Sequence, residues 1–197
     1  MNTEPELVIP SWDQIYGFLL NLAEKIREDS FEPHLIVGVS RGGWPPARVM
    51  SDLLETPQIA NVKAEFYVGV AQSEGEPVIT QPVSASVEDK KVLVVDDVAD
   101  TGKSLSLVDA HLRQKGAAEV KIATIYYKPW SIVVPHYYQR ETSSWVVFPW
   151  ERKETVRNIL QRYQSEEKPI RQAKEKLVRS GLDPELVERF VQEILEG

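Results

Sequence analysis

The sequence predicts an α/β protein whose mostly parallel, twisted sheet has helices on both faces, with a helical extension at the C-terminus. Short apolar runs rich in β-branched residues alternate with stretches of helical periodicity, which is typical of right-handed β-α-β crossovers. After residue 151 the apolar residues recur only at helical spacing. We therefore expect a core domain over residues 1–151 and a helical extension over residues 152–197.

The first predicted elements are a helix, a strand and a second helix. Residues 11–29 begin with Ser-x-x-Gln, which forms a capping box, and continue with apolar residues at helical spacing. Residues 35–39 are a short apolar run, as expected of a buried strand. Pro45 and Pro46 then suit the first turn of the second helix.

The middle of the chain is predicted to hold three strands and a helix. Apolar runs over 64–70, 92–95 and 120–127 are the strands, and residues 105–115 form a helix that ends at Gly116. The carboxyl ends of parallel strands share one edge of the sheet, and ligands bind at that edge in such folds. The polar residues that follow these apolar runs are therefore expected to lie together.

Residues 71–89 show no convincing period and are rich in serine, proline and glutamate. A long excursion of this kind is often a lid over an active site. A hairpin without a functional role is the alternative interpretation. Residues 71–87 contain no arginine or lysine.

The last predicted strand covers residues 145–148, and helices follow it. Gly181 is expected to end one of these helices, and Asp183 and Pro184 to cap and open the next. Each helix has an apolar face, which must pack against the core domain or against a second subunit.

The composition narrows the class of protein. The net charge of −7 disfavours a dedicated nucleic-acid-binding protein, since such proteins neutralise phosphates with basic residues. The absence of cysteine excludes disulfides and thiolate metal sites, and it fits a cytoplasmic location. No apolar run reaches the ~18 residues of a membrane-spanning helix. The N-terminal residues also lack the pattern of a signal peptide.

The most informative segment is Val92–Ser104, VLVVDDVADTGKS. A buried strand runs into two adjacent carboxylates, Asp96 and Asp97, and a glycine-containing turn leads into a helix. Carboxylates can accept hydrogen bonds from a diol and bind a metal ion, while amides at a helix N-terminus bind phosphate. A P-loop is excluded, because that motif needs glycine where this chain has Asp97. An ordinary capped turn is the alternative interpretation.

This segment resembles the phosphoribosyl pyrophosphate signature of the type I phosphoribosyltransferases, which have an α/β fold of the predicted kind. The resemblance implies that Asp96 and Asp97 bind the ribose hydroxyls and take part in holding Mg²⁺. It implies that Asp100 lies beside the purine and accepts the proton of the base. The residues implied in binding the 5′-phosphate are Ala99, Asp100, Thr101, Gly102, Lys103 and Ser104.

A second glycine-containing turn follows the first strand, with the sequence Ser40, Arg41, Gly42 and Gly43. Glycine lets the backbone approach a ligand closely, and the arginine guanidinium matches phosphate oxygens. Taken alone, the segment could be an ordinary turn. It resembles the pyrophosphate loop of the same family, which implies that Arg41 assists catalysis. The resemblance also implies a non-proline cis peptide between Ser40 and Arg41.

Three residues are expected to bind the base. Lys128, at the end of a strand, matches the lysine that 6-oxopurine members of the family place against O6, although a solvated lysine is the alternative. The segment from Trp145 to Glu151 is similar to the ending of bacterial xanthine–guanine phosphoribosyltransferases, which implies that Trp145 stacks on the base. Trp150 is a further candidate, with packing in the core as the alternative.

The expected activity is transfer of the phosphoribosyl group from phosphoribosyl pyrophosphate to N9 of hypoxanthine, guanine or xanthine, with Mg²⁺ as cofactor. The expected products are a nucleotide and pyrophosphate, and the expected role is purine salvage. An enzyme for adenine or another base, or a non-catalytic sensor of phosphoribosyl pyrophosphate, is the alternative. We expect a homo-oligomer, a dimer or larger, without a nucleic-acid or membrane partner.

Overall fold

A computed structural model describes residues 6–67 and 75–196. The chain forms two compact units. The core unit is Ile15–Ser143, and the terminal unit combines Met1–Gln14 with Ser144–Gly197. Within the described residues, no helix has the length and apolar character needed to cross a membrane. The domain boundary that we expect at residue 151 stays a prediction.

The core unit contains a six-stranded sheet with the order β4-β3-β2-β5-β6-β7. All neighbouring strands are parallel except β3 and β4, which confirms the mostly parallel sheet. The strands are β2 (Leu35–Ser40), β3 (Ile59–Tyr67), β4 (Glu76–Gln81), β5 (Lys91–Ala99), β6 (Glu119–Tyr127) and β7 (Tyr137–Glu141).

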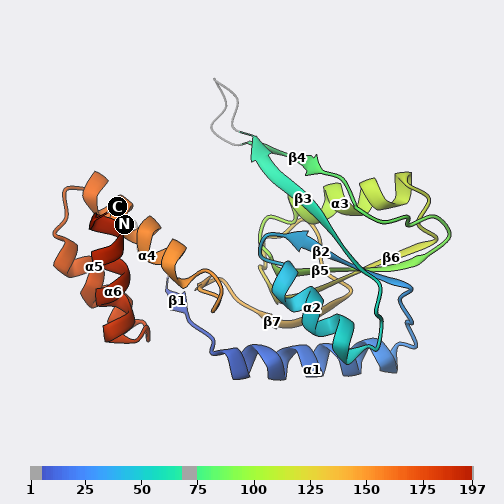
Figure 1. Ribbon diagram of the computed structural model, residues 1–197, viewed down its shortest axis with the longest axis horizontal. Coiled ribbons are helices and arrows are strands. Elements are labelled where there is room, and N and C mark those ends of the chain that lie inside the picture. Colours follow the sequence, from blue (N-terminus) through green and yellow to red (C-terminus); the bar gives the residue numbers. More distant parts are fainter. Residues whose placement is uncertain (1–5, 68–74, 197) are drawn as a thin grey trace. The chain divides into compact units, whose positions relative to one another are not determined.

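Helices cover both faces of this sheet, as predicted. Helix α2 (Trp44–Leu53) and helix α3 (Lys103–Gln114) lie on opposite faces (Figure 1). On the α2 face, Gly38 leaves room for the helix, because a Cβ built there would lie 2.9 Å from Cβ of Ala47. Helix α1 (Trp12–Glu28) buries an apolar stripe that includes Leu19, and its Phe18 meets the Tyr126 ring edge-on.

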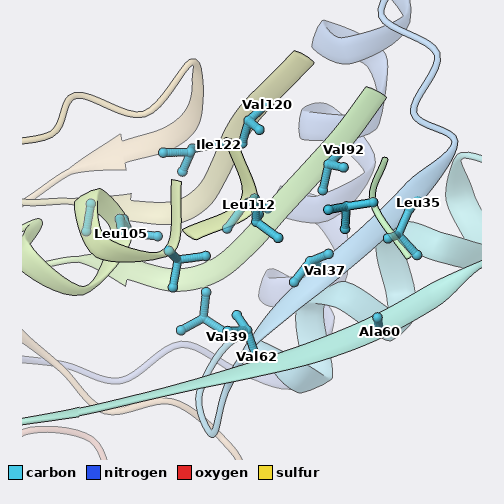
Figure 2. Close-up of a cluster of buried hydrophobic side chains, with 14 of the residues drawn as sticks. Leu35, Val37, Val39, Ala60, Val62, Val92, Leu105, Leu112, Val120 and Ile122 are labelled. Carbon is cyan, nitrogen blue, oxygen red and sulfur yellow. The ribbon is translucent and has the colours of Figure 1, made fainter. Parts of the chain in front are cut away.

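The face under α3 holds a cluster of buried aliphatic side chains (Figure 2). Alternate residues of β2 point into it, since successive side chains of a strand point to opposite faces. From the other side, α3 contributes side chains at helical spacing. The buried residues of the cluster include Leu35, Val37, Val39, Val62, Val92, Val94, Leu105, Val108, Leu112, Val120 and Ile122.

Part of the predicted loop over 71–89 is a strand. Residues 76–81 form β4, which pairs antiparallel with β3 at the edge of the sheet. Its side chains alternate between exposed and half-buried positions, so the apolar pattern is too weak to reveal a strand. Residues 71–74 of the predicted loop, and residues 68–70 of the predicted second strand, lie outside the described residues.

In the terminal unit, the predicted last strand does not belong to the main sheet. Only Trp145–Val146 is strand (β8), and it pairs in parallel with Leu7–Val8 (β1) in a separate two-stranded sheet. Both strands are too short for their pairing partner to be read from the sequence. The strand predicted over residues 145–148 is therefore shorter than expected and lies outside the six-stranded sheet.

The predicted C-terminal helices are α4 (Arg152–Ser165), α5 (Ile170–Arg179) and α6 (Pro184–Glu196). They bury their apolar faces against one another, and Ile9 packs against the same cluster. Leu160 and Leu177 are almost fully buried within it. Asp183 caps α6, because the backbone N–H of Leu186 donates to its Oδ1 at 2.9 Å.

Candidate active site

The two predicted ligand loops lie at one edge of the core sheet. Strands β2 and β5 are parallel neighbours, and β5 and β6 are as well, so their carboxyl ends share that edge. The turn with Arg41 follows β2, the turn with Asp100 follows β5, and Lys128 follows β6. The sequence-based expectation that these polar segments meet at one edge is confirmed.

A pocket of about 140 Å³ opens beside the end of β5. Carboxylates line one part of it and the turn before α3 lines another, a mixture that suits a ligand with both hydroxyl and phosphate groups. Phe66 of β3, which is 49% exposed, also lines the pocket and was not expected from the sequence. The lining residues are Phe66, Asp96, Val98, Asp100, Thr101, Gly102, Ser104 and Leu105.

The acidic pair lies within β5, which continues four residues past the predicted end of the strand. Asp97 is buried, and its Oδ1 accepts a hydrogen bond from the backbone N–H of Val98 at 2.8 Å. Asp96 Oδ1 accepts from the N–H of Asp97 at 3.0 Å. Burial raises the pKa of the Asp96 carboxyl well above its ordinary value, and the adjacent Asp97 charge raises it further. Two neighbouring carboxylates in a poorly solvated place are suited to a cation and to hydroxyl donors.

The turn after β2 packs directly on this acidic pair. A Cβ built on Gly42 would lie 2.1 Å from Oδ2 of Asp97, so no larger residue fits there without moving the carboxylate. The peptide between Ser40 and Arg41 is cis, as the resemblance to the pyrophosphate loop implies. Arg41 is exposed, and Ser40 Oγ accepts from the side-chain amide of Asn61 at 3.5 Å.

The turn after β5 leads into α3 through Gly102, whose φ of 78° is the left-handed conformation that glycine favours. Thr101 Oγ1 accepts from the backbone N–H of Lys103 at 3.4 Å. The Lys103 ammonium lies 3.1 Å from a carboxylate oxygen of Glu76, which opens β4. The structure thus places the predicted phosphate residues Ala99–Ser104 together around the N-terminus of α3, where backbone N–H groups favour an anion.

Lys128 is only 6% exposed, so it is not an ordinary solvated lysine at a strand end. Its backbone N–H donates to the carbonyl oxygen of Ala99 at 3.0 Å, which ties the end of β6 to the end of β5, where the predicted phosphate turn (Ala99–Ser104) begins. Burial lowers the pKa of the Lys128 ammonium, and the nearby Asp100 charge works against that shift. A buried cation of this kind suits a polar acceptor on a ligand.

The structure places Trp130 beside Asp100 and Lys128, a position that no sequence pattern indicates. The indole Nε1–H donates to Asp100 Oδ1 at 3.0 Å. The Lys128 ammonium lies 5.4 Å from the centre of the indole ring, within the range of a cation–π contact. Trp130 comes directly after Pro129, beyond the end of the strand. Its contact with Asp100 spans 30 positions of the sequence, so local sequence pattern cannot predict it.

The other two predicted base residues belong to the terminal unit. Trp145 is 51% exposed on β8. The Trp150 ring stacks on Phe148 at 4.9 Å between centroids and lies 5.5 Å from the Trp12 ring. Their part in base binding stays a prediction.

A scan of known families matches the chain to the phosphoribosyl transferase domain over residues 11–154. The crystal structure of a purine phosphoribosyltransferase from Pyrococcus horikoshii Ot3 is 41% identical, with a TM-score of 0.67, over 74% of this chain and 93% of that one. A xanthine-guanine phosphoribosyltransferase from Cereibacter sphaeroides is 30% identical over 72% of this chain and 84% of its own length. One from Gluconobacter oxydans is 27% identical over 72% and 82%.

Proposed function

The chain belongs to the phosphoribosyl transferase domain family and is a purine phosphoribosyltransferase, and we propose that its purine is a 6-oxopurine: hypoxanthine, guanine or xanthine. It would transfer the 5-phosphoribosyl group of phosphoribosyl pyrophosphate to N9 of that base and release pyrophosphate. The names of the two xanthine-guanine relatives support this choice. The nucleotide product places the enzyme in purine salvage, and a cytoplasmic location and a homo-oligomeric state belong to the same proposal.

In the proposed reaction, the N9–C1 bond forms as the bond between C1 and the pyrophosphate oxygen breaks. Negative charge develops on the leaving pyrophosphate, and Arg41 with the amides of its turn would stabilise that charge. Asp96 and Asp97 would hold the ribose hydroxyls, and the Ala99–Ser104 turn would hold the 5′-phosphate. Asp100 would accept the base proton directly or through one water molecule. The chain would therefore contribute positioning and electrostatic stabilisation.

Members of this family typically use Mg²⁺ with phosphoribosyl pyrophosphate. The acidic pair fits such an ion, because two neighbouring carboxylates offer the oxygen ligands that Mg²⁺ prefers, and a cation would offset the cost of holding two adjacent negative charges. Among the described residues no cluster of three or more acidic or histidine side chains is suited to a metal, so substrate oxygens and water would complete the coordination. When bound, Mg²⁺ supplies charge neutralisation to the pyrophosphate.

The observation that carries the 6-oxopurine proposal is the buried Lys128, held against the phosphate turn by the 3.0 Å hydrogen bond to Ala99. The lysine ammonium is only a donor of hydrogen bonds. It can donate to a carbonyl oxygen at C6 of the purine, whereas the amino group of adenine at that position would be repelled. The proposed specificity is therefore a preference for purines that present an acceptor at C6.

The experiment is replacement of Lys128 by alanine, with Lys115→Ala as a control at the exposed end of α3. Loss of a charged hydrogen-bond donor costs about 1.5–3 kcal/mol, so kcat/KM for the preferred oxopurine should fall ten- to a hundredfold. KM for phosphoribosyl pyrophosphate should change much less. An enzyme whose oxopurine kinetics are the same in Lys128→Ala and Lys115→Ala would contradict the proposed role.

A further inference from the structure

The Trp130 side chain contacts both residues that would handle the base. Its N–H donates to Oδ1 of Asp100 at 3.0 Å, and its ring lies 5.4 Å from the ammonium of Lys128. The indole nevertheless remains 53% exposed, so burial of apolar area accounts for only part of its placement. Packing alone therefore does not explain why this half-exposed indole contacts the side chains of both Asp100 and Lys128.

The backbone around Trp130 is fixed relative to the phosphate turn. The N–H of Ser131 donates to the carbonyl of Lys128, and the N–H of Ile132 donates to the carbonyl of Thr101, both at 3.0 Å. A Cβ built on Gly102 would lie 2.5 Å from Oγ of Ser131, so the two segments are in close contact. The indole is therefore held at a defined place beside Asp100, and a hydrogen bond from a rigid donor can fix the orientation of that carboxylate.

We propose that Trp130 is a positioning residue, which holds Asp100 in the orientation for taking the proton of the purine. The inference rests on the proposed function. The indole N–H occupies Oδ1, so Oδ2 receives the proton while the N9–C1 bond forms and the bond from C1 to pyrophosphate breaks. Without this donor Asp100, which is exposed, could rotate into solvent, and the proton acceptor would be held in a productive geometry for less of the time.

The ring of Trp130 has a second effect on the same site. Its face lies within cation–π range of the Lys128 ammonium, which favours the charged form and limits the positions it samples. The N–H acts on Asp100, and the ring face acts on Lys128, so a phenylalanine at this position separates the two effects. Phenylalanine keeps an aromatic face and has no donor.

The first measurement compares Trp130→Phe with the wild-type enzyme in steady-state kinetics with the preferred oxopurine. The N–H donates to a carboxylate, and the loss of such a bond should lower kcat roughly ten- to a hundredfold. KM for the base should change less than about threefold, since the Lys128 contact is kept. Val134→Ala is the matched control, because Val134 is 62% exposed in the same segment, and its kinetics should equal those of the wild type.

A double-mutant cycle with Asp100→Asn tests whether Trp130 acts through Asp100. Trp130→Phe should lower kcat in the wild type and have no further effect in Asp100→Asn. If the two losses multiply, or if Trp130→Phe alone has a normal kcat, the inference is wrong. All variants are compared at a temperature where their unfolding curves show them folded. A wild-type chain inactive on every 6-oxopurine would instead contradict the proposed function itself.

Discussion

Asp97 and Gly42 define the site at the scale of single residues. The glycine has no room for a side chain, because a Cβ would lie 2.1 Å from Oδ2 of Asp97. The carboxylate is buried and accepts the N–H of Val98, so it cannot move without losing that bond or meeting other atoms. The position of the Asp97 carboxylate, which is proposed to bind the ribose, thus depends on a glycine in a different loop.

Gly42→Ala should therefore disturb substrate binding more than folding. The added methyl group must displace the Asp97 carboxylate, and we expect KM for phosphoribosyl pyrophosphate to rise at least about tenfold, or ~1.4 kcal/mol. Asp97→Asn should show the same loss without steric change and should unfold no earlier than wild type, because it removes one of two adjacent charges. Steady-state kinetics and thermal unfolding check both variants. A Gly42→Ala enzyme with unchanged KM would contradict the dependence of substrate binding on the position of the Asp97 carboxylate.

The site residues could be predicted from the sequence to the extent that their chemistry is local. Consecutive residues form each of the three predicted features, which are the acidic pair, the predicted phosphate turn and the turn with Arg41. The resemblance to the family implies their roles. Trp130 and Phe66 escaped prediction because their contacts are made across the fold. No sequence pattern indicates Phe66, because an exposed aromatic residue that lines a ligand pocket has the same sequence context as one that does not.

At the scale of elements, a polar cluster joins the end of α1 to strands β6 and β7. Lys121 Nζ and the Tyr137 hydroxyl each lie 2.5 Å from Oδ2 of Asp29. The hydrogen bonds from Lys121 and Tyr137 lower the pKa of Asp29. The pKa of Tyr137 is raised to about 12, mainly by burial and to a smaller extent by its hydrogen bond to Asp29. The cluster is thus strongest when Asp29 is ionised and Tyr137 is neutral.

The stability contributed by this cluster should be lost at both ends of the pH scale. Asp29 has a lowered pKa in the folded state, so its contribution is present above its ordinary value of 3.8 and is lost as the pH falls below it. Tyr137 has a raised pKa, so its contribution is present below pH 10 and is lost as the pH rises towards about 12. Unfolding midpoints of wild type and Asp29→Asn should therefore differ most between these limits. A difference that stays constant down to pH 3 would contradict this account.

The elements could be predicted where apolar residues recur with a clear period. The helices and the buried strands β2, β5 and β6 were found for that reason. Strand β7 was missed because its sequence, Tyr-Tyr-Gln-Arg-Glu, has no apolar alternation at the sheet edge. Strand β4 also lacks a clear apolar alternation, so its sequence favours a loop. The sheet to which β8 belongs cannot be read from the sequence, because strand pairing is a non-local property.

At the scale of the whole molecule, an acidic chain must bind a polyphosphate. The net charge of −7 repels such a ligand at long range, so positive potential has to be concentrated at one edge of the core sheet. Arg41 and Lys128 lie in segments at that edge, as does Lys103, whose ammonium also pairs with Glu76. The N-terminus of α3 adds its backbone dipoles at the same place. The expected Mg²⁺ would supply the remaining charge.

We propose that this edge of the core sheet joins phosphoribose to a purine with an oxygen at C6. The most direct test follows nucleotide formation by absorbance with phosphoribosyl pyrophosphate, Mg²⁺ and each of hypoxanthine, guanine, xanthine and adenine in turn. We predict turnover of one or more of the three oxopurines and none of adenine. Turnover of adenine alone would contradict the role given to Lys128 and the base specificity that rests on it.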